Sequence, residues 1–380
     1  MSTFITHAHL VSPDAERFDA TLELHEGRIR RILDAGATLP AGGTVFDAAG
    51  RLVVPGFIDE HCHGGMGYEV TGDDPRGITI IGEAKLREGV TAFCPTTLTL
   101  PEEKLAASMR HIEAYRRAPS GCKVIGTHLE GPYINPQCTG AQNPAYLRQP
   151  DLAEVLRLHA ISPVALVTYA IEQPGCLAFT RELAKAGIRG SCGHSDATYA
   201  QFKEAMPLGL KRLTHFCNQM TKLHHREIGL VGAGLLEDEV AIEMICDKIH
   251  LCPDMIRLAF HAKPIGRILL ITDAMEATGL PDGNYQLGGL EVVVADGAAR
   301  LSSNGALAGS TLQFNAALRN AAEVTGLPLP ELVKTTSWNQ AVDLGITDMG
   351  RLEPGFVADI VVLDETFNVA AVFLDGVRKM

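Results

Sequence analysis

Two histidines separated by one residue, His61 and His63, follow an apolar run in "VVPGFIDEHCHGG", and together they could bind a metal ion. Alternation along an extended strand turns both side chains to the same side and puts Cys62 on the opposite face. Neutral imidazole suits Zn²⁺, Fe²⁺ and Mn²⁺. A single pair of this kind is structural or incidental at least as often as functional, so it predicts a metal site only together with further ligands.

Four more metal-competent side chains occur at the ends of other β-like runs. Glu130 lies in "HLEGP", His194 in "GHSDA", His215 in "THFCN" and Asp273 in "ITDAM". Taken singly, each has an ordinary structural reading, as a packed histidine or a helix N-cap. Six such groups behind successive strands are hard to obtain by chance. They predict one or two divalent cations, with zinc favoured and iron or manganese left open.

The segments that must position these residues alternate along the middle of the chain. Eight β-like runs lie at 52–59, 90–96, 123–131, 164–172, 188–196, 211–218, 240–247 and 267–274. Amphipathic segments separate most of them, for example "PEEKLAASMRHIEAYRRA", in which Pro101 suits the first helical position and arginines come late. The alternation predicts a (β/α)8 barrel over 54–345, with its active site at the carboxyl ends of the strands.

The two ends of the chain have a different pattern. Residues 1–53 and 346–380 contain β-like pieces separated by Gly, Pro and Asp, as in "ATLELHEGRIRRIL" and "GRLEPGFVADIVVLD". We expect them to pair into one small β-sandwich domain whose parts are distant in sequence and adjacent in space.

Composition limits the class of partner. The 380 residues carry a net charge of -12 with no block of Lys or Arg, which argues against nucleic acid or an acidic membrane. A phosphorylated small substrate stays open, because one arginine can hold it. Nine scattered cysteines, no signal-like start and no apolar run of membrane-spanning length predict a cytoplasmic protein with reduced thiols.

Several motifs carry a family resemblance. "VVPGFIDEHCHGG" and "GRLEPGFVADIVVLD" resemble the amidohydrolase superfamily. "HLEGPYINPQCTGAQNP", "GHSDATY", "THFCNQMTKLHHREIGLVG", "ITDAMEATGLPDG" and "LAGSTL" resemble the N-acetylglucosamine-6-phosphate deacetylase family, in that family's order. The resemblance implies metal-dependent hydrolysis of the N-acetyl group to give glucosamine-6-phosphate and acetate, in amino-sugar catabolism or recycling.

The resemblance also implies roles for the metal-competent residues. Glu130, His194 and His215 match the ligands that such deacetylases share, and His61 and His63 match the pair in members that hold a second metal. A bound metal would polarise the amide carbonyl and activate water. Asp273 would be the general base and would then protonate the leaving sugar nitrogen. Metal ligation by Asp273 is compatible with that role.

Substrate contacts and a homodimer follow from the same resemblance. It implies the substrate-binding residues Gln142, Asn218, Gln219 (through its backbone), His225, Arg226, His250 and Leu307. Arg226 and His225 would hold the phosphate, in the site of their own chain or of a neighbouring subunit, because an arginine fork matches phosphate oxygens. Without the resemblance, a surface ion pair with Glu227 is the more ordinary reading of Arg226.

The chain departs from the family's motifs at two of these positions. Gln142 stands in "GAQNP" where the family often has histidine, and glutamine carries no proton in the physiological range. Gln219 in "CNQM" replaces alanine and predicts a preference for another amino sugar, such as the galacto epimer. Cys138 lies in the loop after the third strand, as an ordinary exposed thiol or as part of a lid.

Two other functions stay open. One is a different amidohydrolase, of the dihydroorotase or N-acyl-amino-acid type, although Glu130 stands where the cyclic-amide members carry a modified lysine. The other is a barrel that has lost its metal and serves in binding or assembly, against which the intact His/Glu/Asp set argues.

Overall fold

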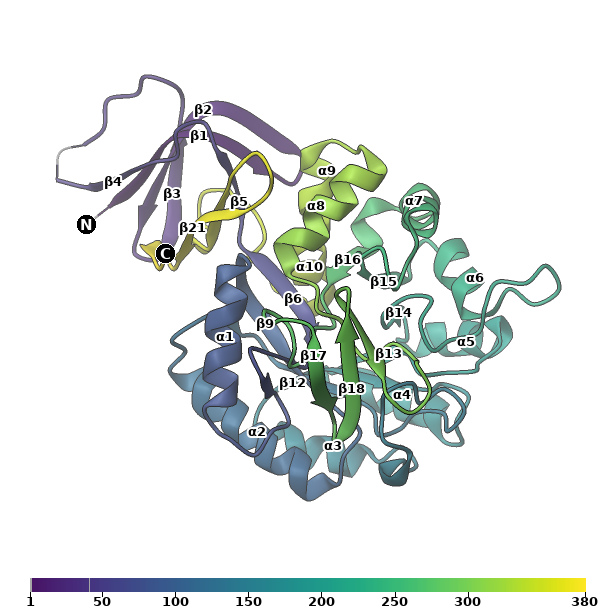
Figure 1. Ribbon diagram of the computed structural model, residues 1–380. Helices are drawn as coiled ribbons and strands as arrows, with labels where there is room; N and C mark the ends of the chain where they lie inside the picture. Colours follow the sequence, from purple (N-terminus) through teal and green to yellow (C-terminus); the bar gives the residue numbers. More distant parts are fainter. Residues whose placement is uncertain (1, 41) are drawn as a thin grey trace.

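Parallel strands close into a barrel at the centre of the computed structural model, which describes residues 2–40 and 42–380 (Figure 1). Their order is β6-β9-β11-β12-β13-β14-β15-β16, and a parallel bridge from Cys62 to Ala274 joins the two ends. The strands are β6 (Phe57–Cys62), β9 (Val90–Thr97), β11 (Thr127–Glu130), β12 (Val164–Tyr169), β13 (Arg189–Cys192), β14 (Arg212–Leu213), β15 (Ala241–Ile245) and β16 (Ile268–Ile271). A short strand, β10 (Lys123–Val124), also pairs with β9. The predicted barrel is confirmed.

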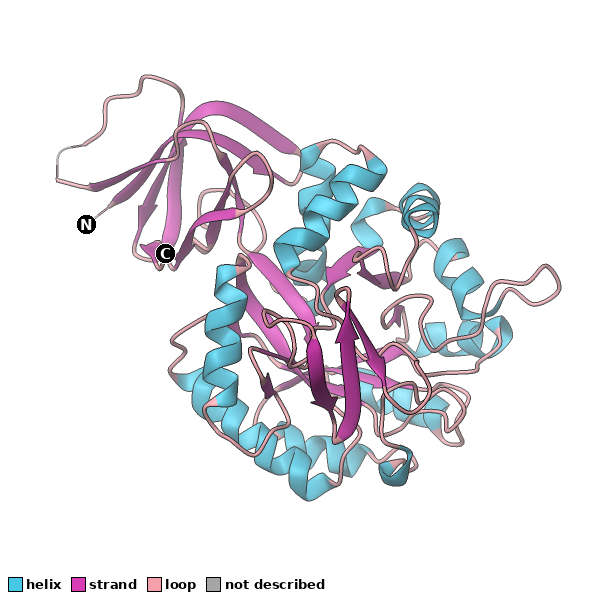
Figure 2. Cartoon of the chain, in the orientation of Figure 1, coloured by secondary structure: helices cyan, strands magenta, loops and turns pink. Residues whose placement is uncertain are grey.

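Helices surround the barrel (Figure 2). They are α1 (Gly77–Arg87), α2 (Glu102–Arg117), α3 (Leu152–His159), α4 (Cys176–Lys185), α5 (Tyr199–Ala205), α6 (Gly229–Leu236), α7 (Pro253–Ala262) and α8 (Phe314–Thr325). Local sequence explains several starts: Pro101 precedes α2 as its N-cap rather than occupying its first turn, Asp151 caps α3, and Thr198 forms a capping box with Gln201 at α5. Among the described residues, no helix has both the length and the hydropathy needed to cross a bilayer.

Short helical segments complete this layer. Turns of 3₁₀ helix lie at η1 (Pro144–Tyr146), η2 (Met206–Leu208) and η3 (Ile265–Arg267). After α8, the chain continues through α9 (Leu329–Val333), a π-helical segment η4 (Lys334–Trp338) and α10 (Asn339–Leu344).

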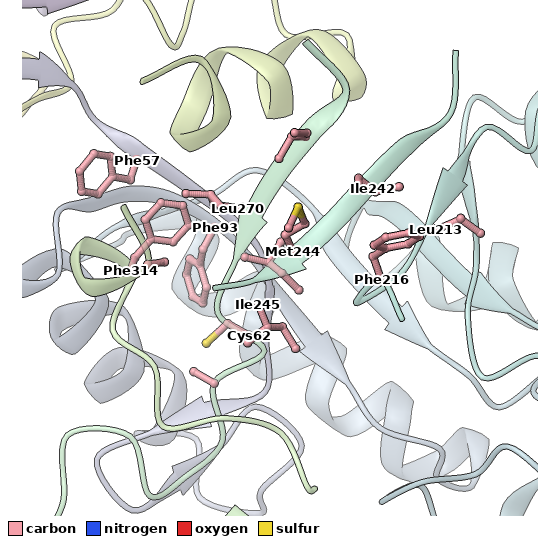
Figure 3. Close-up of a cluster of buried hydrophobic side chains, with 14 of the residues drawn as sticks. Phe57, Cys62, Phe93, Leu213, Phe216, Ile242, Met244, Ile245, Leu270 and Phe314 are labelled. Carbon is pink, nitrogen blue, oxygen red and sulfur yellow. The ribbon is translucent and has the colours of Figure 1, made fainter. Parts of the chain in front are cut away.

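One large apolar core fills the space between strands and helices. Figure 3 shows part of it, with side chains from β6, β9, β14, β15, β16 and α8. Phe57 and Phe314 stack with their ring centres 5.2 Å apart. Cys62 belongs to this core, as expected for the residue between two histidines that face the other way.

Strands from both chain ends form a single sheet beside the barrel. Its order is β22-β21-β20-β5-β1-β2-β3, with β4 paired to β1. The strands are β1 (Thr3–Ser12), β2 (Ala15–His25), β3 (Arg28–Leu33), β4 (Thr44–Asp47), β5 (Leu52–Pro55), β20 (Ile360–Leu363), β21 (Val369–Leu374) and β22 (Val377–Arg378). A bridge from Arg28 to Val357 shows that the sheet curls and encloses its own core. Val361 faces the barrel core, while Ile360 and Val362 face the core of the small sheet.

A three-stranded antiparallel sheet and a separate two-stranded hairpin beside the barrel were not expected from the sequence. After β16, the chain forms an antiparallel sheet of β17 (Gly283–Leu287), β18 (Leu290–Ala295) and β19 (Ala298–Leu301), seen at the front of Figure 1. Gly288 and Gly289 join β17 to β18 with φ of 58° and 80°, which glycine adopts without steric cost. A smaller pair, β7 (Gly64–Gly65) and β8 (Tyr68–Glu69), follows β6.

Candidate active site

The six predicted metal-competent side chains meet inside the barrel. His61 and His63 lie at the end of β6, Glu130 ends β11, and His194, His215 and Asp273 follow β13, β14 and β16. Their ligand atoms form two groups, His61/His63/Asp273 and Glu130/His194/His215, each within 4.8 Å. All six residues are less than 9 % exposed.

Glu130 joins the two groups. Its Oε1 lies 3.0 Å from Nε2 of His215, 3.3 Å from Nε2 of His194 and 3.4 Å from Nε2 of His61. Its Oε2 lies 3.2 Å from Nε2 of His63. Ligands placed 2.0–2.1 Å from a tetrahedral zinc ion are separated by roughly 3.3 Å. The spacing within the set therefore matches coordination spheres rather than ordinary side-chain packing.

Three of the imidazoles are held with a lone pair toward this centre. Nδ1 of His61 donates to Oε2 of Glu243 at 3.0 Å, Nδ1 of His63 to the Thr96 carbonyl at 3.2 Å, and Nδ1 of His194 to the Cys138 carbonyl at 2.7 Å. In a neutral ring, Nε2 is then unprotonated. Nε2 atoms of His61 and His63 lie 3.2 Å apart, so their lone pairs repel unless a cation or proton lies between them.

The burial and the pKa of Glu130 also suit a divalent cation. Oε1 of Glu130 is buried and faces imidazole nitrogens, and among the residues that the structure describes it accepts no other hydrogen bond. Burial alone would raise the pKa of Glu130, but the charge and hydrogen bonds of His61, His194 and His215 hold it well below its usual range. The residues present are therefore suited to a divalent cation, whose binding would displace protons from the histidines.

Asp273 is ionised within this set. Burial alone would raise the pKa of the Asp273 carboxyl, but the neighbouring His61 and His63 lower it below its ordinary value. Its Oδ1 lies 3.3 Å from Nε2 of His63 and 3.5 Å from Nε2 of His61. An ionised carboxylate beside the cavity can accept a proton, as general-base chemistry requires.

Three of these residues have strained backbones. His194, His215 and Asp273 have φ of 49°, 29° and 51°, in a region that non-glycine residues rarely adopt. Hydrogen bonds hold each one: the His194 carbonyl accepts from Asn135, the His215 N–H donates to Glu243, and the Asp273 N–H donates to the His61 carbonyl. The strain is localised where strand ends turn side chains into the barrel mouth.

A cavity of about 210 Å³ opens onto the metal-competent set. It brings together the predicted substrate-binding residues Gln142, Asn218, Gln219, His250 and Leu307 with His63, Glu130, His194, His215 and Asp273. The hairpin β17–β18 contributes Leu287 to the lining, and Leu98 and Leu307 add apolar surface. The sequence predicted Leu307 as part of this wall but not Leu287, because the hairpin that carries Leu287 was missed.

Gln142 contacts a metal-competent residue directly. Its Nε2 donates to Oε2 of Glu130 at 2.5 Å, and its Oε1 accepts the backbone N–H of Thr99 at 2.6 Å. The amide is therefore engaged by the protein on both sides. The expected contact with substrate stays a prediction, and the observed contacts make Gln142 a support for Glu130.

The other polar lining residues keep free groups toward the cavity. The amide nitrogen of Asn218 donates to the carbonyls of His215 and Phe216, and its side-chain oxygen has no hydrogen-bond partner within residues 2–40 and 42–380. Nδ1 of His250 lies 2.7 Å from the Asp247 carboxylate, which leaves Nε2 for another partner. Gln219 has φ of 47° and packs against Gly140, where an added Cβ would lie 2.9 Å from it.

His225 and Arg226 are not brought into the cavity of the single chain. They lie on an exposed loop before α6, where Nη1 of Arg226 is 2.9 Å from Nε2 of His225. Within residues 2–40 and 42–380, neither lysine nor arginine lines the cavity. A phosphate bound there would meet no lysine or arginine from the described residues of its own chain.

Several buried polar residues around the site were missed from the sequence. Glu243 and Arg212 lie inside the barrel, and His128 packs against His61 with ring centres 4.6 Å apart. His128 has both nitrogens engaged, by the Glu60 carbonyl at 3.2 Å and Thr168 Oγ1 at 2.7 Å. A charged residue inside a β-like run, such as the glutamate in "VAIEMICD", was the available signal.

Comparisons with known proteins agree with this geometry. The model of the amidohydrolase family matches residues 52–379. An N-acetylglucosamine-6-phosphate deacetylase from Lysinibacillus sphaericus is 36% identical over 368 residues, 96% of this chain and 94% of its own. An N-acetylgalactosamine-6-phosphate deacetylase from Escherichia coli O157:H7 is 39% identical over 360 residues, 93% of this chain and 94% of its own.

Solved structures show the same relationship. The N-acetylglucosamine-6-phosphate deacetylase of Thermotoga maritima superposes with a TM-score of 0.89 at 37% identity, covering 99% of both chains. A mutant of the Mycobacterium smegmatis enzyme, in complex with N-acetyl-D-glucosamine-6-phosphate, superposes with a TM-score of 0.90 at 32% identity, again over 99% of both chains.

Proposed function

The chain belongs to the amidohydrolase family and, within it, to the deacetylases of amino-sugar phosphates, and we propose that it hydrolyses the N-acetyl group of N-acetylglucosamine-6-phosphate. The products are glucosamine-6-phosphate and acetate. The observation that carries the proposal is the meeting of Glu130 with four imidazoles and Asp273 at the floor of a cavity. This set argues against a barrel without metal.

The residues at the cavity have separate roles in the proposed reaction. A divalent cation bound by these residues would polarise the amide carbonyl and lower the pKa of water. Asp273 takes one proton from the attacking water, whose oxygen forms a bond to the acetyl carbon. The protonated Asp273 then donates to the sugar nitrogen as the C–N bond breaks. Leu307 and Leu98 supply an apolar wall for the acetyl methyl group.

The nature of the ligands favours zinc, with iron or manganese as alternatives. Glu130, His194 and His215 would form one site, and His61, His63 and Asp273 would supply a second, with Glu130 between them. Imidazole and carboxylate ligands suit all three metals, so ligand type alone does not choose between them.

The phosphate is proposed to be bound by a second subunit. The cavity carries no lysine or arginine from its own described residues, while Arg226 and His225 are exposed on a projecting loop. A homodimer that places this loop over the partner's cavity would supply the missing charge. We place this reaction in the cytoplasm, where phosphorylated amino sugars are metabolised.

A second candidate substrate is the galacto epimer. Gln219 lines the cavity and offers an amide where the family often has alanine, and one relative named above acts on N-acetylgalactosamine-6-phosphate. An added hydrogen-bonding group beside the sugar can distinguish the orientation of one hydroxyl.

Acetate release from three compounds tests the proposed function. The purified protein would be given N-acetylglucosamine-6-phosphate, its galacto epimer and unphosphorylated N-acetylglucosamine. Faster turnover of the two phosphates supports the proposal, and Gln219→Ala should alter the ratio between epimers if Gln219 reads the sugar. Turnover of none of the three by metal-loaded protein would contradict it.

A further inference from the structure

Glu243 touches both groups of metal-competent residues from inside the barrel. It lies on β15, is fully buried, and uses its two oxygens separately. Oε2 accepts Nδ1–H of His61 at 3.0 Å and the backbone N–H of His215 at 3.1 Å. Oε1 accepts from Nε of Arg212 at 3.1 Å and from Nη2 at 2.7 Å.

Arg212 fixes which oxygen faces the histidines. Its guanidinium has only donors, and it is held by three carboxylates, two of them buried on barrel strands and one on α10. Besides Glu243, Nη2 donates to Oε2 of Glu60 at 2.7 Å and Nη1 donates to Oδ2 of Asp343 at 2.5 Å. A side chain held from three directions cannot turn away without leaving buried charges unpaired.

His61 and His215 each depend on the other carboxylate oxygen of Glu243, Oε2. In His61, donation from Nδ1 leaves a lone pair on Nε2, which faces Glu130 and Asp273. In His215, φ of 29° is a strained conformation, and the N–H bond to Glu243 helps to hold it. One carboxylate oxygen therefore sets a side chain in one group and a backbone in the other.

We propose that Glu243 is a positioning residue for both groups of metal ligands. Its Oε2 selects the tautomer of His61 that can bind a cation and holds the backbone of His215, while Arg212 keeps that oxygen turned toward them. The inference rests on the metal dependence of the proposed function and is independent of which sugar is the substrate.

Glu243→Gln separates this role from packing, because it preserves shape while it removes one negative charge and changes hydrogen bonding. If the amide oxygen faces Arg212, the NH₂ group faces His61 and the His215 N–H. His61 must then accept at Nδ1 and carry its hydrogen on Nε2, toward the cation position. If the amide turns over, NH₂ faces the guanidinium, where two donors meet in a buried site. Either orientation of the amide leaves unsatisfied hydrogen-bond donors, on the side of Arg212 or on the side of the histidines.

The test measures metal binding without substrate. Zn²⁺ affinity of the metal-free protein would be measured by chelator competition, for wild type and Glu243→Gln. We expect affinity to fall about 10- to 100-fold, the usual effect of losing such an outer partner. In metal-free ¹⁵N-histidine protein, at a pH high enough for the His61 ring to be neutral, the His61 signals, assigned with His61→Gln, should move from the Nδ1–H to the Nε2–H pattern.

Glu60→Gln is the matched control. It makes the same isosteric change in another fully buried partner of Arg212, but in the described part of the chain the Glu60 carboxylate makes no hydrogen bond or ion pair with a metal-competent side chain. We expect its Zn²⁺ affinity to stay within about threefold of wild type. The inference is overturned if Glu243→Gln binds Zn²⁺ like wild type, if the His61 tautomer does not change, or if Glu60→Gln loses as much affinity as Glu243→Gln.

Discussion

Arg226 should act in the active site of the neighbouring subunit, and this can be tested by combining two damaged chains. Arg226 is exposed in the single chain, so Arg226→Gln should leave the fold intact. A lost hydrogen bond to a charged group is worth about 1.5–3 kcal/mol, which corresponds to a fall in kcat/KM of about 10- to 150-fold. Lys222→Gln removes a charge from the same exposed loop and should have little effect.

The decisive version pairs Arg226→Gln with Asp273→Asn, each nearly inactive alone. In a hybrid dimer carrying one chain of each kind, one site has both an intact Asp273 and the partner's intact Arg226. Hybrids isolated with two affinity tags should therefore recover about half of the wild-type rate of acetate release per dimer. If Arg226 acted within its own chain, neither site of the hybrid would be complete. Recovery no greater than that of the parent variants would refute the account of the phosphate site.

Three further results are expected. Replacing His61 and His63 together with glutamine should leave one metal per chain, at the Glu130 group, with some turnover; metal analysis showing the full wild-type complement would contradict the two-site assignment. Gln142→Ala removes the donor to Oε2 of Glu130 and should lower metal affinity about 10- to 100-fold in chelator competition; unchanged affinity would remove Gln142 from the support of Glu130. Burial lowers the pKa of Lys263 to about 8. Below that pH the buried ammonium is charged and lowers the free energy of unfolding by its full amount. This destabilisation decreases as the pH rises toward the pKa of lysine in the unfolded chain. Lys263→Met should therefore raise Tm more at pH 6 than at pH 10, and an equal change at both would argue against the shift.

The barrel and the metal-competent set could be predicted because each depends on a simple periodic rule. Alternation in "EHCH" placed His61 and His63 on one face, and the structure holds their Nε2 atoms 3.2 Å apart. Barrel geometry then brought Glu130, on a separate strand, within 3.2 Å of His63.

What was missed depends on partners that a sequence does not reveal. Glu243 reads as one charged residue in an apolar run, and its contacts to His61 and Arg212 come from three different strands. The hairpin β17–β18 is different, because it carried a readable signal. "QLGGLEV" has two glycines between β-like runs, which is typical of a two-residue turn, but the hairpin was not recognised.

The central claim is that the His/Glu/Asp centre uses a bound divalent cation to cleave an amide. The most direct measurement is acetate release from N-acetylglucosamine-6-phosphate by one preparation before chelation, after chelation and after Zn²⁺ is restored, with metal content determined at each stage. We predict that activity disappears with the metal and returns with it. Undiminished acetate release from protein shown to be free of metal would contradict it.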